Sequence, residues 1–168
     1  MSFDPNAFLD ALRRDRGYAG QLVHVQTLRA REPRYGRLNA RLSPPVQAAL
    51  AATGAERLYT HQAEAVGAVF RGENVCVVTP TASGKTLCYN LPVLNRLLEN
   101  PNARALYLFP TKALGQDQVK ELTSTIETLQ VKIGTYTFDG DTPSNARKAV
   151  RQAGHIVVTN PDMLHAGI

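Results

Sequence analysis

The amino-acid sequence predicts an α/β fold in which helices flank a parallel sheet. Two observations support this class. Four short apolar runs with strand character alternate with longer helical stretches, which is the pattern of βαβ units. The turns after these runs are rich in Gly, Pro and Thr, and parallel sheets bind ligands at the carboxyl ends of their strands. We expect strands at residues 74–79, 105–109, 131–138 and 155–159, with helices at 84–99, 112–128 and 144–152.

An arginine-rich lead-in of helical and irregular structure is expected at residues 1–57, ahead of a single lobe at residues 58–168. Helical patches at 5–16 and 45–53 are separated by Gly and Pro. Before position 58, nine arginines stand against five acidic residues. Arginine pairs with phosphate through a rigid fork of donors, so this imbalance favours a polyanionic partner, although a solvated charged face has the same composition.

Length, composition and cysteine use exclude several classes of protein. The 168 residues have the length of one domain, and 43% of them are hydrophobic, so the chain can bury a core. No apolar run is long enough to span a bilayer, and Asp4, Asp10 and Asp15 stand where a secretory signal would need apolar residues. We therefore expect a cytoplasmic protein with no membrane partner. Cys76 and Cys88 lack the C-x-x-C spacing of a zinc site, so we expect structural thiols.

A loop at a strand-to-helix junction carries the strongest functional signal. It reads Thr79-Pro80-Thr81-Ala82-Ser83-Gly84-Lys85-Thr86. The backbone N–H groups of such a turn, and the positive end of the helix after it, attract a phosphate group. We expect Lys85 to reach the β- and γ-phosphates of ATP, and Thr86 to bind the Mg²⁺ that accompanies the nucleotide. Thr79 stands where the standard pattern has Gly, so the match is to its looser form.

This loop and an earlier segment resemble two motifs of the superfamily 2 helicases of the DEAD/DEAH-box kind. Residues 80–86 are similar to motif I, and Leu58-Tyr59-Thr60-His61-Gln62 resembles the Q motif. The resemblance implies that Gln62 reads the edge of adenine through a paired hydrogen bond, whereas an amide that only caps a helix is the structural alternative. Residues 42–53 contain no aromatic residue, so the ring that many members stack on adenine is not expected there.

Three later segments resemble the motifs that contact nucleic acid in the same family, and they occur in the family's order. Residues 109–114 are similar to motif Ia, residues 138–142 to motif Ib, and residues 159–164 to the T-x-P-D-x-L motif. The resemblance implies contacts with single-stranded DNA or another nucleic acid at Pro110, Thr111, Lys112, Gly140, Thr159 and Pro161. Such contacts hold phosphates and position a strand without reading its sequence. Taken singly, each segment is also an ordinary strand–turn–helix junction.

The resemblance covers residues 58–164, and the residues of the motifs are most similar to the branch of mitomycin-repair-factor-like DNA helicases. It implies a partial RecA-like (P-loop NTPase) sheet and an ATP- and Mg²⁺-dependent 3′-to-5′ DNA helicase with a role in DNA repair. Longer members end in a zinc-binding cysteine cluster. That cluster has no counterpart in this sequence, so zinc is not implied.

The sequence contains no Asp-Glu pair, which superfamily 2 enzymes use in motif II to hold Mg²⁺ and the attacking water. Motif III, the second RecA-like lobe and its arginine fingers are also absent. We therefore expect a truncated or fragment chain that is inactive by itself and works with the missing helicase portion. Two alternatives remain. One is a non-enzymatic module that binds nucleotide, nucleic acid or a protein partner, and the other is a small complete P-loop ATPase that uses Asp139 as its metal ligand.

Overall fold

The computed structural model describes residues 3–30 and 32–167, and the chain divides into two compact units, one ending at Glu32 and the other beginning at Pro33. The first unit contains helix α1 (Pro5–Arg14). Asp4 caps this helix, because its carboxylate accepts hydrogen bonds from the backbone N–H groups of Asn6 and Ala7. None of the α1 residues is buried within the described structure.

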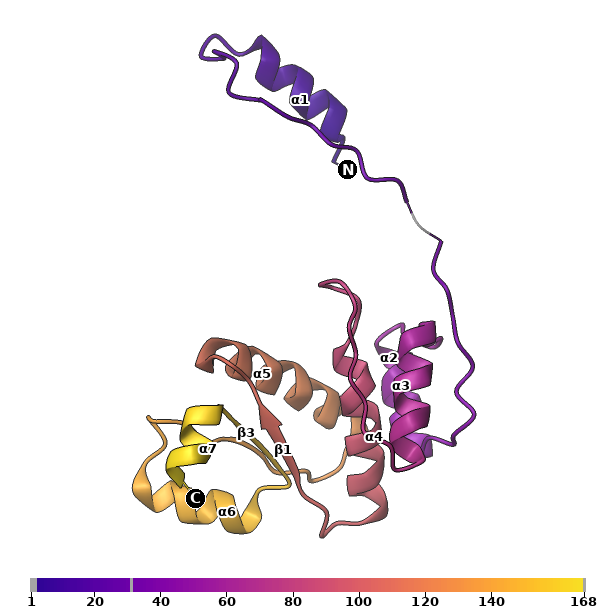
Figure 1. Ribbon diagram of the computed structural model, residues 1–168, viewed down its shortest axis with the longest axis vertical. Coiled ribbons are helices and arrows are strands. Elements are labelled where there is room, and N and C mark those ends of the chain that lie inside the picture. Colours follow the sequence, from indigo (N-terminus) through magenta and orange to yellow (C-terminus); the bar gives the residue numbers. More distant parts are fainter. Residues whose placement is uncertain (1–2, 31, 168) are drawn as a thin grey trace. The chain divides into compact units, whose positions relative to one another are not determined.

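The second unit holds a parallel sheet and most of the helices (Figure 1). In chain order its elements are α2 (Pro44–Ala52), α3 (Thr60–Phe70), α4 (Thr86–Glu99), β1 (Ala105–Leu108), α5 (Lys112–Leu129), β2 (Thr135–Thr137), α6 (Ser144–Ala153), β3 (Ile156–Thr159) and α7 (Pro161–Gly167). The expected strand at 131–138 is shorter than predicted, while the helices expected after positions 84, 112 and 144 all form. The predicted α/β class is confirmed.

The sheet has the order β1-β3-β2, and both pairings are parallel. Ile156 of β3 stands opposite Ala105 of β1 and Thr135 of β2, so β3 is the central strand. Helix α5 lies on one face of the sheet, and α6 and α7 lie on the other side (Figure 1). Ile156 and Val158 point to the face that α5 covers and are buried there. On the opposite face Leu106 and Tyr136 are 51% and 39% exposed, so that face is only partly covered. The parallel order also brings the ends of all three strands to one edge.

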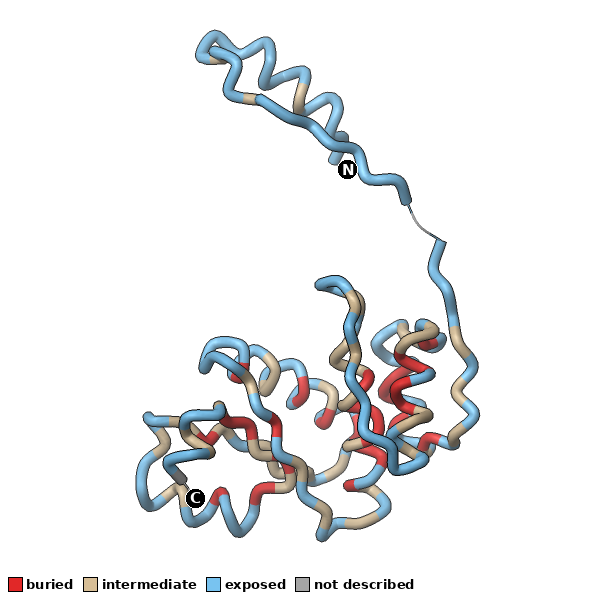
Figure 2. Tube along the Cα trace, in the orientation of Figure 1, coloured by how far each residue is buried: buried red, intermediate tan, exposed pale blue. Residues whose placement is uncertain are grey.

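The core of the second unit lies between the helices and the sheet (Figure 2). Its most deeply buried large side chains are Leu94, Leu122, Ile156, Val46 and Val66. Helix α2, which belongs to the expected lead-in, contributes to this core. Asn95 of α4 ties the start of α2 to α4, since its Oδ1 accepts a hydrogen bond from the N–H of Ser43 (2.6 Å). Its Nδ2 donates to Glu99 Oε1 within α4 (2.7 Å).

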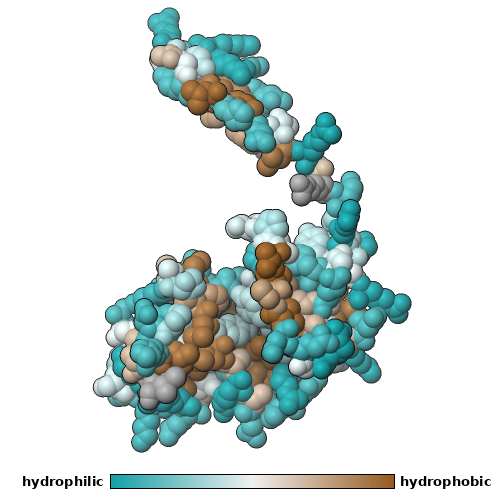
Figure 3. All heavy atoms as spheres, viewed as in Figure 1, coloured by the Kyte–Doolittle hydropathy of each residue, from teal (hydrophilic) through white to brown (hydrophobic). Residues whose placement is uncertain are grey.

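The strand expected at residues 74–79 does not form, and that prediction is wrong. The segment is extended but pairs with no strand in the described part of the chain. Val75 and Val78 are 40% and 89% exposed, and apolar side chains gather on the surface both here and over β1 (Figure 3). The apolar β-branched residues that signalled a strand favour an extended backbone, but a strand also needs a neighbour whose backbone completes the ladder. Here β1 pairs with β3 alone.

The two cysteines differ in their surroundings. Cys88 is buried in the first turn of α4, and burial raises the pKa of its thiol, so it stays protonated. Cys76 is exposed and free, because its segment lacks a covering neighbour, so a structural role for its thiol stays a prediction. Within residues 3–30 and 32–167, no helix has the length and apolar character that crossing a bilayer requires, and no three metal-binding side chains gather at one point.

Candidate functional site

The loop from Thr79 to Thr86 closes on itself through the side chain of Lys85. The Lys85 ammonium donates hydrogen bonds to the carbonyl oxygens of Thr79 (2.9 Å) and Pro80 (2.8 Å). The hydroxyls of Thr79 and Ser83 lie 2.6 Å apart and hydrogen bond across the loop. Lys85 directly precedes α4, whose N-terminus carries partial positive charge. An ammonium held by carbonyls at this point is placed to exchange them for the oxygens of an anion.

The backbone of the loop requires glycine at one position. Gly84 has a φ of +74°, a conformation that residues with a Cβ adopt only at a cost. A Cβ added there would also lie 2.6 Å from Nε2 of Gln62. Ala82 has a φ of 60° as well, so the loop stores strain just before the helix begins.

The start of α3 holds this loop at two adjacent carbonyls. Gln62 is buried, its Oε1 accepts a hydrogen bond from the N–H of Tyr59 (2.8 Å), and its Nε2 donates to the carbonyl oxygen of Gly84 (2.8 Å). His61 Nε2 lies 3.0 Å from the carbonyl oxygen of Ser83, which can only accept, so this nitrogen carries the proton. Gln62 keeps one amide N–H and one lone pair that are not used in these two bonds. The amide is therefore both a helix cap and a link to the phosphate loop.

Two tyrosines lie beside this junction although they are distant in the sequence. Tyr35 and Tyr59 form an antiparallel bridge, and their rings stack with centroids 5.5 Å apart. The Tyr59 ring also stacks on His61, with centroids 6.0 Å apart. The Arg57 guanidinium lies 3.9 Å from the centre of the Tyr35 ring. A series of planar groups in contact thus reaches from Arg57 to the histidine that holds the phosphate loop.

A second group of expected site residues gathers at the carboxyl ends of the strands. Thr111 caps α5, and its hydroxyl accepts a hydrogen bond from the N–H of Leu114 (3.3 Å). Lys112 forms an ion pair with Asp141 and lies 3.8 Å from Asp139 Oδ2. Asp139 also accepts a hydrogen bond from the N–H of Asp141 (3.0 Å). A lysine expected to hold a phosphate is therefore held by two carboxylates in this state.

The other members of the second group differ in accessibility. Thr159 is buried at the end of β3, and its hydroxyl donates to the carbonyl oxygen of Phe138 (2.6 Å), so it fixes the neighbouring strand end. Pro110, Gly140 and Pro161 are exposed, and a Cβ at Gly140 would meet no atom within 4 Å. The open backbone at these strand ends leaves room for a polymer.

The two groups of site residues are linked through α4 and α5. Within the described residues, no hydrogen bond or ion pair joins the Thr79–Thr86 loop to the strand-end group directly. Tyr89 of α4 donates a hydrogen bond to Gln118 Oε1 of α5 (2.9 Å), and these two helices begin at the loop and at Lys112, respectively. Burial raises the pKa of the Tyr89 phenol, so it remains a donor. Asp139, the alternative metal ligand, contacts Lys112 and the turn around Asp141.

Sequence reasoning missed two features of this region. The pairing of Lys112 with Asp141 spans 29 residues, and no periodicity connects them. Tyr35 lies before residues 42–53, the stretch that lacks an adenine-stacking ring. The bridge between Tyr35 and Tyr59 has no sequence signal beyond the two aromatic residues, because it depends on where residues 33–36 cross the start of α3.

Comparison with known proteins identifies the family. The DEAD/DEAH box helicase family matches residues 59–168. The chain is 49% identical over 147 residues to the "Uncharacterized ATP-dependent helicase YprA" of Bacillus subtilis, covering 88% of this chain and 20% of that protein. A crystal structure of the helicase MrfA bound to DNA matches 98% of this chain and 23% of its own, with a TM-score of 0.82 and 44% identity. MrfA bound to DNA and AMPPNP matches 80% of this chain and 19% of its own, with a TM-score of 0.77 and 52% identity.

The chain spans about a fifth of the length of these relatives. The family match at residues 59–168 includes the loop, the strand ends and the helices between them, and the similarity to YprA and MrfA places the chain with the mitomycin-repair-factor-like branch. The chain belongs to the DEAD/DEAH box helicase family.

Proposed function

We propose that this chain provides the ATP-binding and nucleic-acid-binding part of the first motor lobe of a 3′-to-5′ DNA helicase. One observation carries the proposal. The Lys85 ammonium sits at the start of α4 in a loop of two positive-φ residues, and its hydrogen bonds within the described part of the chain go to two backbone carbonyl oxygens. A phosphate group is the ligand that would replace those carbonyls at a helix N-terminus.

The residues around the loop fit Mg²⁺-ATP. Lys85 would turn from Thr79 and Pro80 to the β- and γ-phosphates, Thr86 would hold Mg²⁺, and Gln62 would offer its remaining N–H and lone pair to adenine. The backbone of residues 80–84 would surround the phosphates. When bound, Mg²⁺-ATP supplies the phosphoryl group whose transfer drives the motor.

The strand ends fit a nucleic-acid backbone. Lys112 and the Thr111 hydroxyl would hold phosphates, with the exposed backbone at Pro110, Gly140 and Pro161 alongside. Thr159 would contribute to strand binding indirectly, since its hydroxyl already donates a hydrogen bond to the carbonyl oxygen of Phe138. These residues support binding of a strand through its phosphates. The crystal structures of MrfA with DNA, and with DNA and AMPPNP, favour DNA as the polymer.

The test separates the two binding surfaces in the chain. AMPPNP binding is measured by calorimetry and single-stranded DNA binding by fluorescence anisotropy. We expect Lys85→Ala to abolish nucleotide binding and leave DNA binding intact, and Lys112→Ala to weaken DNA binding and leave nucleotide binding intact. Lys132→Ala and Lys120→Ala, at exposed lysines outside both groups, are the matched controls. A parent chain that binds neither ligand under conditions in which it is folded would refute the proposal.

Turnover distinguishes the proposal from a small complete ATPase. Because the sequence contains no Asp-Glu pair, we expect no measurable ATP hydrolysis by the 168-residue chain, with or without DNA, and hydrolysis only together with helicase segments that supply the acidic pair and the arginine fingers. Hydrolysis that Lys85→Ala and Asp139→Ala both abolish would support the ATPase alternative instead.

A further inference from the structure

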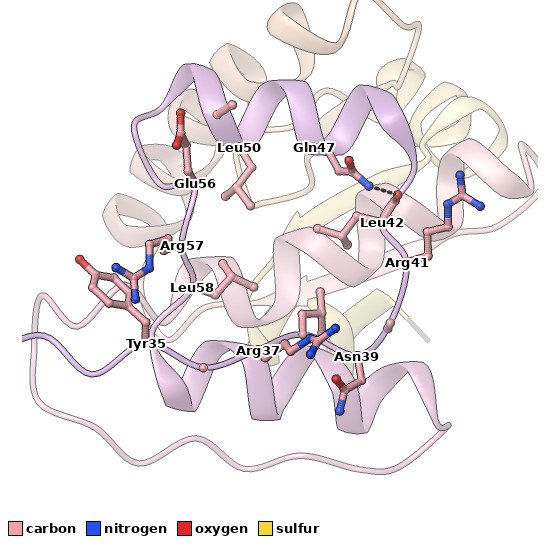
Figure 4. A pocket seen from close by; sticks show the side chains of 14 residues that line it. Tyr35, Arg37, Asn39, Arg41, Leu42, Gln47, Leu50, Glu56, Arg57 and Leu58 are labelled. Atoms are coloured by element: carbon pink, nitrogen blue, oxygen red, sulfur yellow. Dashed lines mark hydrogen bonds between the residues drawn. The ribbon is translucent and has the colours of Figure 1, made fainter.

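A basic groove lies on the surface formed by the segment from Tyr35 to Leu42, helix α2 and residues 56–58, and it adjoins the phosphate-loop junction through Tyr35 and Arg57 (Figure 4). Its volume is about 820 Å³. Leu42, Leu50 and Leu58 are buried and form its apolar floor. The groove is thus a wide channel with an apolar floor, and its charged side chains decide what it attracts.

Three arginines and one glutamate supply the charge of this groove, a net charge of +2. Arg57 stands at one end, Arg37 in the middle and Arg41 at the other end (Figure 4). In the described residues, none of the three guanidinium groups forms an ion pair with a carboxylate, Glu56 included. Like charges gathered without counterions raise the local potential and attract an anion.

The linear arrangement of the arginines favours a polymer over a single phosphate. From Arg37 to Arg41 the backbone advances four residues, which spans at most about 14 Å, and Arg57 extends the row beyond Arg37 (Figure 4). The three side chains come from different points along the groove, and the Arg57 guanidinium lies over the Tyr35 ring, so the charges are arranged in a row. A row of guanidinium forks matches the repeating phosphates of a nucleic-acid strand, and an arginine fork suits a phosphate better than a lysine ammonium does.

The wall of the groove is held in place by its own backbone contacts. The N–H of Gly36 donates to the carbonyl oxygen of Leu58 (3.0 Å), and the N–H of Thr60 donates to the carbonyl oxygen of Arg34 (3.0 Å). A Cβ at Gly36 would lie 2.9 Å from Cβ of Ala63, so the segment is packed closely against α3. A preformed wall lowers the ordering cost of binding.

We propose that this groove is a second nucleic-acid site, which binds the phosphodiester backbone of a single strand through Arg37, Arg41 and Arg57. The identity of the polymer rests on the proposed function. The groove itself is distinct from the strand-end surface around Lys112, and it accounts for part of the arginine excess at the start of the sequence.

The test compares two triple variants that lose the same charge. One replaces Arg37, Arg41 and Arg57 with Gln. The control replaces Arg71, Arg96 and Arg104, which are exposed and lie outside the groove. Binding to fluorescein-labelled oligo(dT) is measured by anisotropy over a range of salt concentrations. Each phosphate contact to a single strand contributes about 0.7 to the slope of log K against log salt, so we expect the groove variant to lower this slope by about 2 and the control to change it little.

Further arms separate this proposal from the proposed function and from another polyanion. If Lys112→Ala leaves DNA binding unchanged while the groove variant weakens it, the strand-end surface fails and the groove stands. Equal effects of the two triple variants, or an unchanged slope in the groove variant, would overturn the groove. Polyglutamate that competes with oligo(dT) at equal charge, and that the groove variant no longer binds, would assign the groove to an acidic polypeptide and overturn the nucleic-acid assignment. A folded parent chain that binds no oligo(dT) would overturn it too.

Discussion

Replacing Gln62 with Ala tests whether one side chain joins the start of α3 to the phosphate loop and also reads the nucleotide base. The substitution removes two hydrogen bonds of 2.8 Å, one from the Tyr59 N–H and one to the Gly84 carbonyl, and Gln62 is only 3% exposed. Each buried hydrogen bond contributes about 0.5–1.5 kcal/mol, so the free energy of unfolding should fall by about 1–3 kcal/mol.

The same change should weaken nucleotide binding. A paired hydrogen bond to adenine has a similar worth, so we expect ATP affinity to fall about 5- to 150-fold and the preference for ATP over GTP to be lost. Unfolding is followed in urea by circular dichroism, and AMPPNP and GMPPNP binding by calorimetry. Gln47→Ala is the matched control, because Gln47 also donates one amide hydrogen bond, to the carbonyl of Leu42 (2.7 Å), but is exposed and distant in sequence from the loop.

The two measurements separate the structural role of Gln62 from its role at the base. A stability loss with unchanged affinity and selectivity would leave Gln62 a helix cap and refute its contact with adenine. Unchanged stability would refute the reasoning about the two hydrogen bonds. A loss of affinity in Gln47→Ala as large as that in Gln62→Ala would show that the effect has nothing to do with the phosphate loop.

Three further predictions concern charge, packing and ionisation. Asp141→Asn should raise the affinity for single-stranded DNA about 1.4- to 5-fold at low salt, because it frees Lys112 from an exposed ion pair worth about 0.2–1 kcal/mol. Fluorescence anisotropy measures the affinity, and an equal gain in Asp117→Asn would refute the role of this ion pair. Leu94→Ala should lower the free energy of unfolding by about 2–5 kcal/mol because Leu94 is 1% exposed, whereas Leu106→Ala, at a position that is 51% exposed, should cost much less in the same urea titration. Burial raises the pKa of the Tyr107 phenol well above its usual range, so the unfolded chain releases this proton first as pH rises. The free energy of unfolding should therefore fall from about pH 10 upward, and it should fall less in Tyr107→Phe. Equal slopes of unfolding free energy against pH in the parent and the variant would contradict the burial argument.

Much of the fold follows from local patterns in the sequence. The helix predicted at 112–128 forms as α5, from Lys112 to Leu129, because Thr111 is a good cap and apolar residues recur on one face. The strand at Ile156–Thr159 is equally predictable from its run of β-branched residues. These elements depend on their own residues and on a core that the same residues supply.

The features that the sequence does not predict share a physical cause, since each depends on a distant partner. Residues 74–79 have the composition of a strand, yet a ladder needs a second backbone, and composition does not say whether one is present. The pairing of Lys112 with Asp141 and the stacking of Tyr35 on Tyr59 depend on how strand ends and loops cross in space. For the candidate site, the sequence located the phosphate loop and the strand ends, and the spatial structure added the groups that compete for or hold their side chains.

The unpaired segment at residues 74–79 makes nucleotide binding and sheet completion two linked equilibria. The phosphate loop continues into α4 at one end and into this segment at the other, so a nucleotide that fixes Thr79 and Pro80 must also restrict a backbone that no ladder restrains. Fixing each residue costs about 1–2 kcal/mol of backbone entropy. A strand that pairs with this segment would meet part of that cost in advance and tighten ATP binding, and by reciprocity ATP would tighten the pairing. The affinity of the chain for ATP should therefore increase when a further strand pairs with residues 74–79.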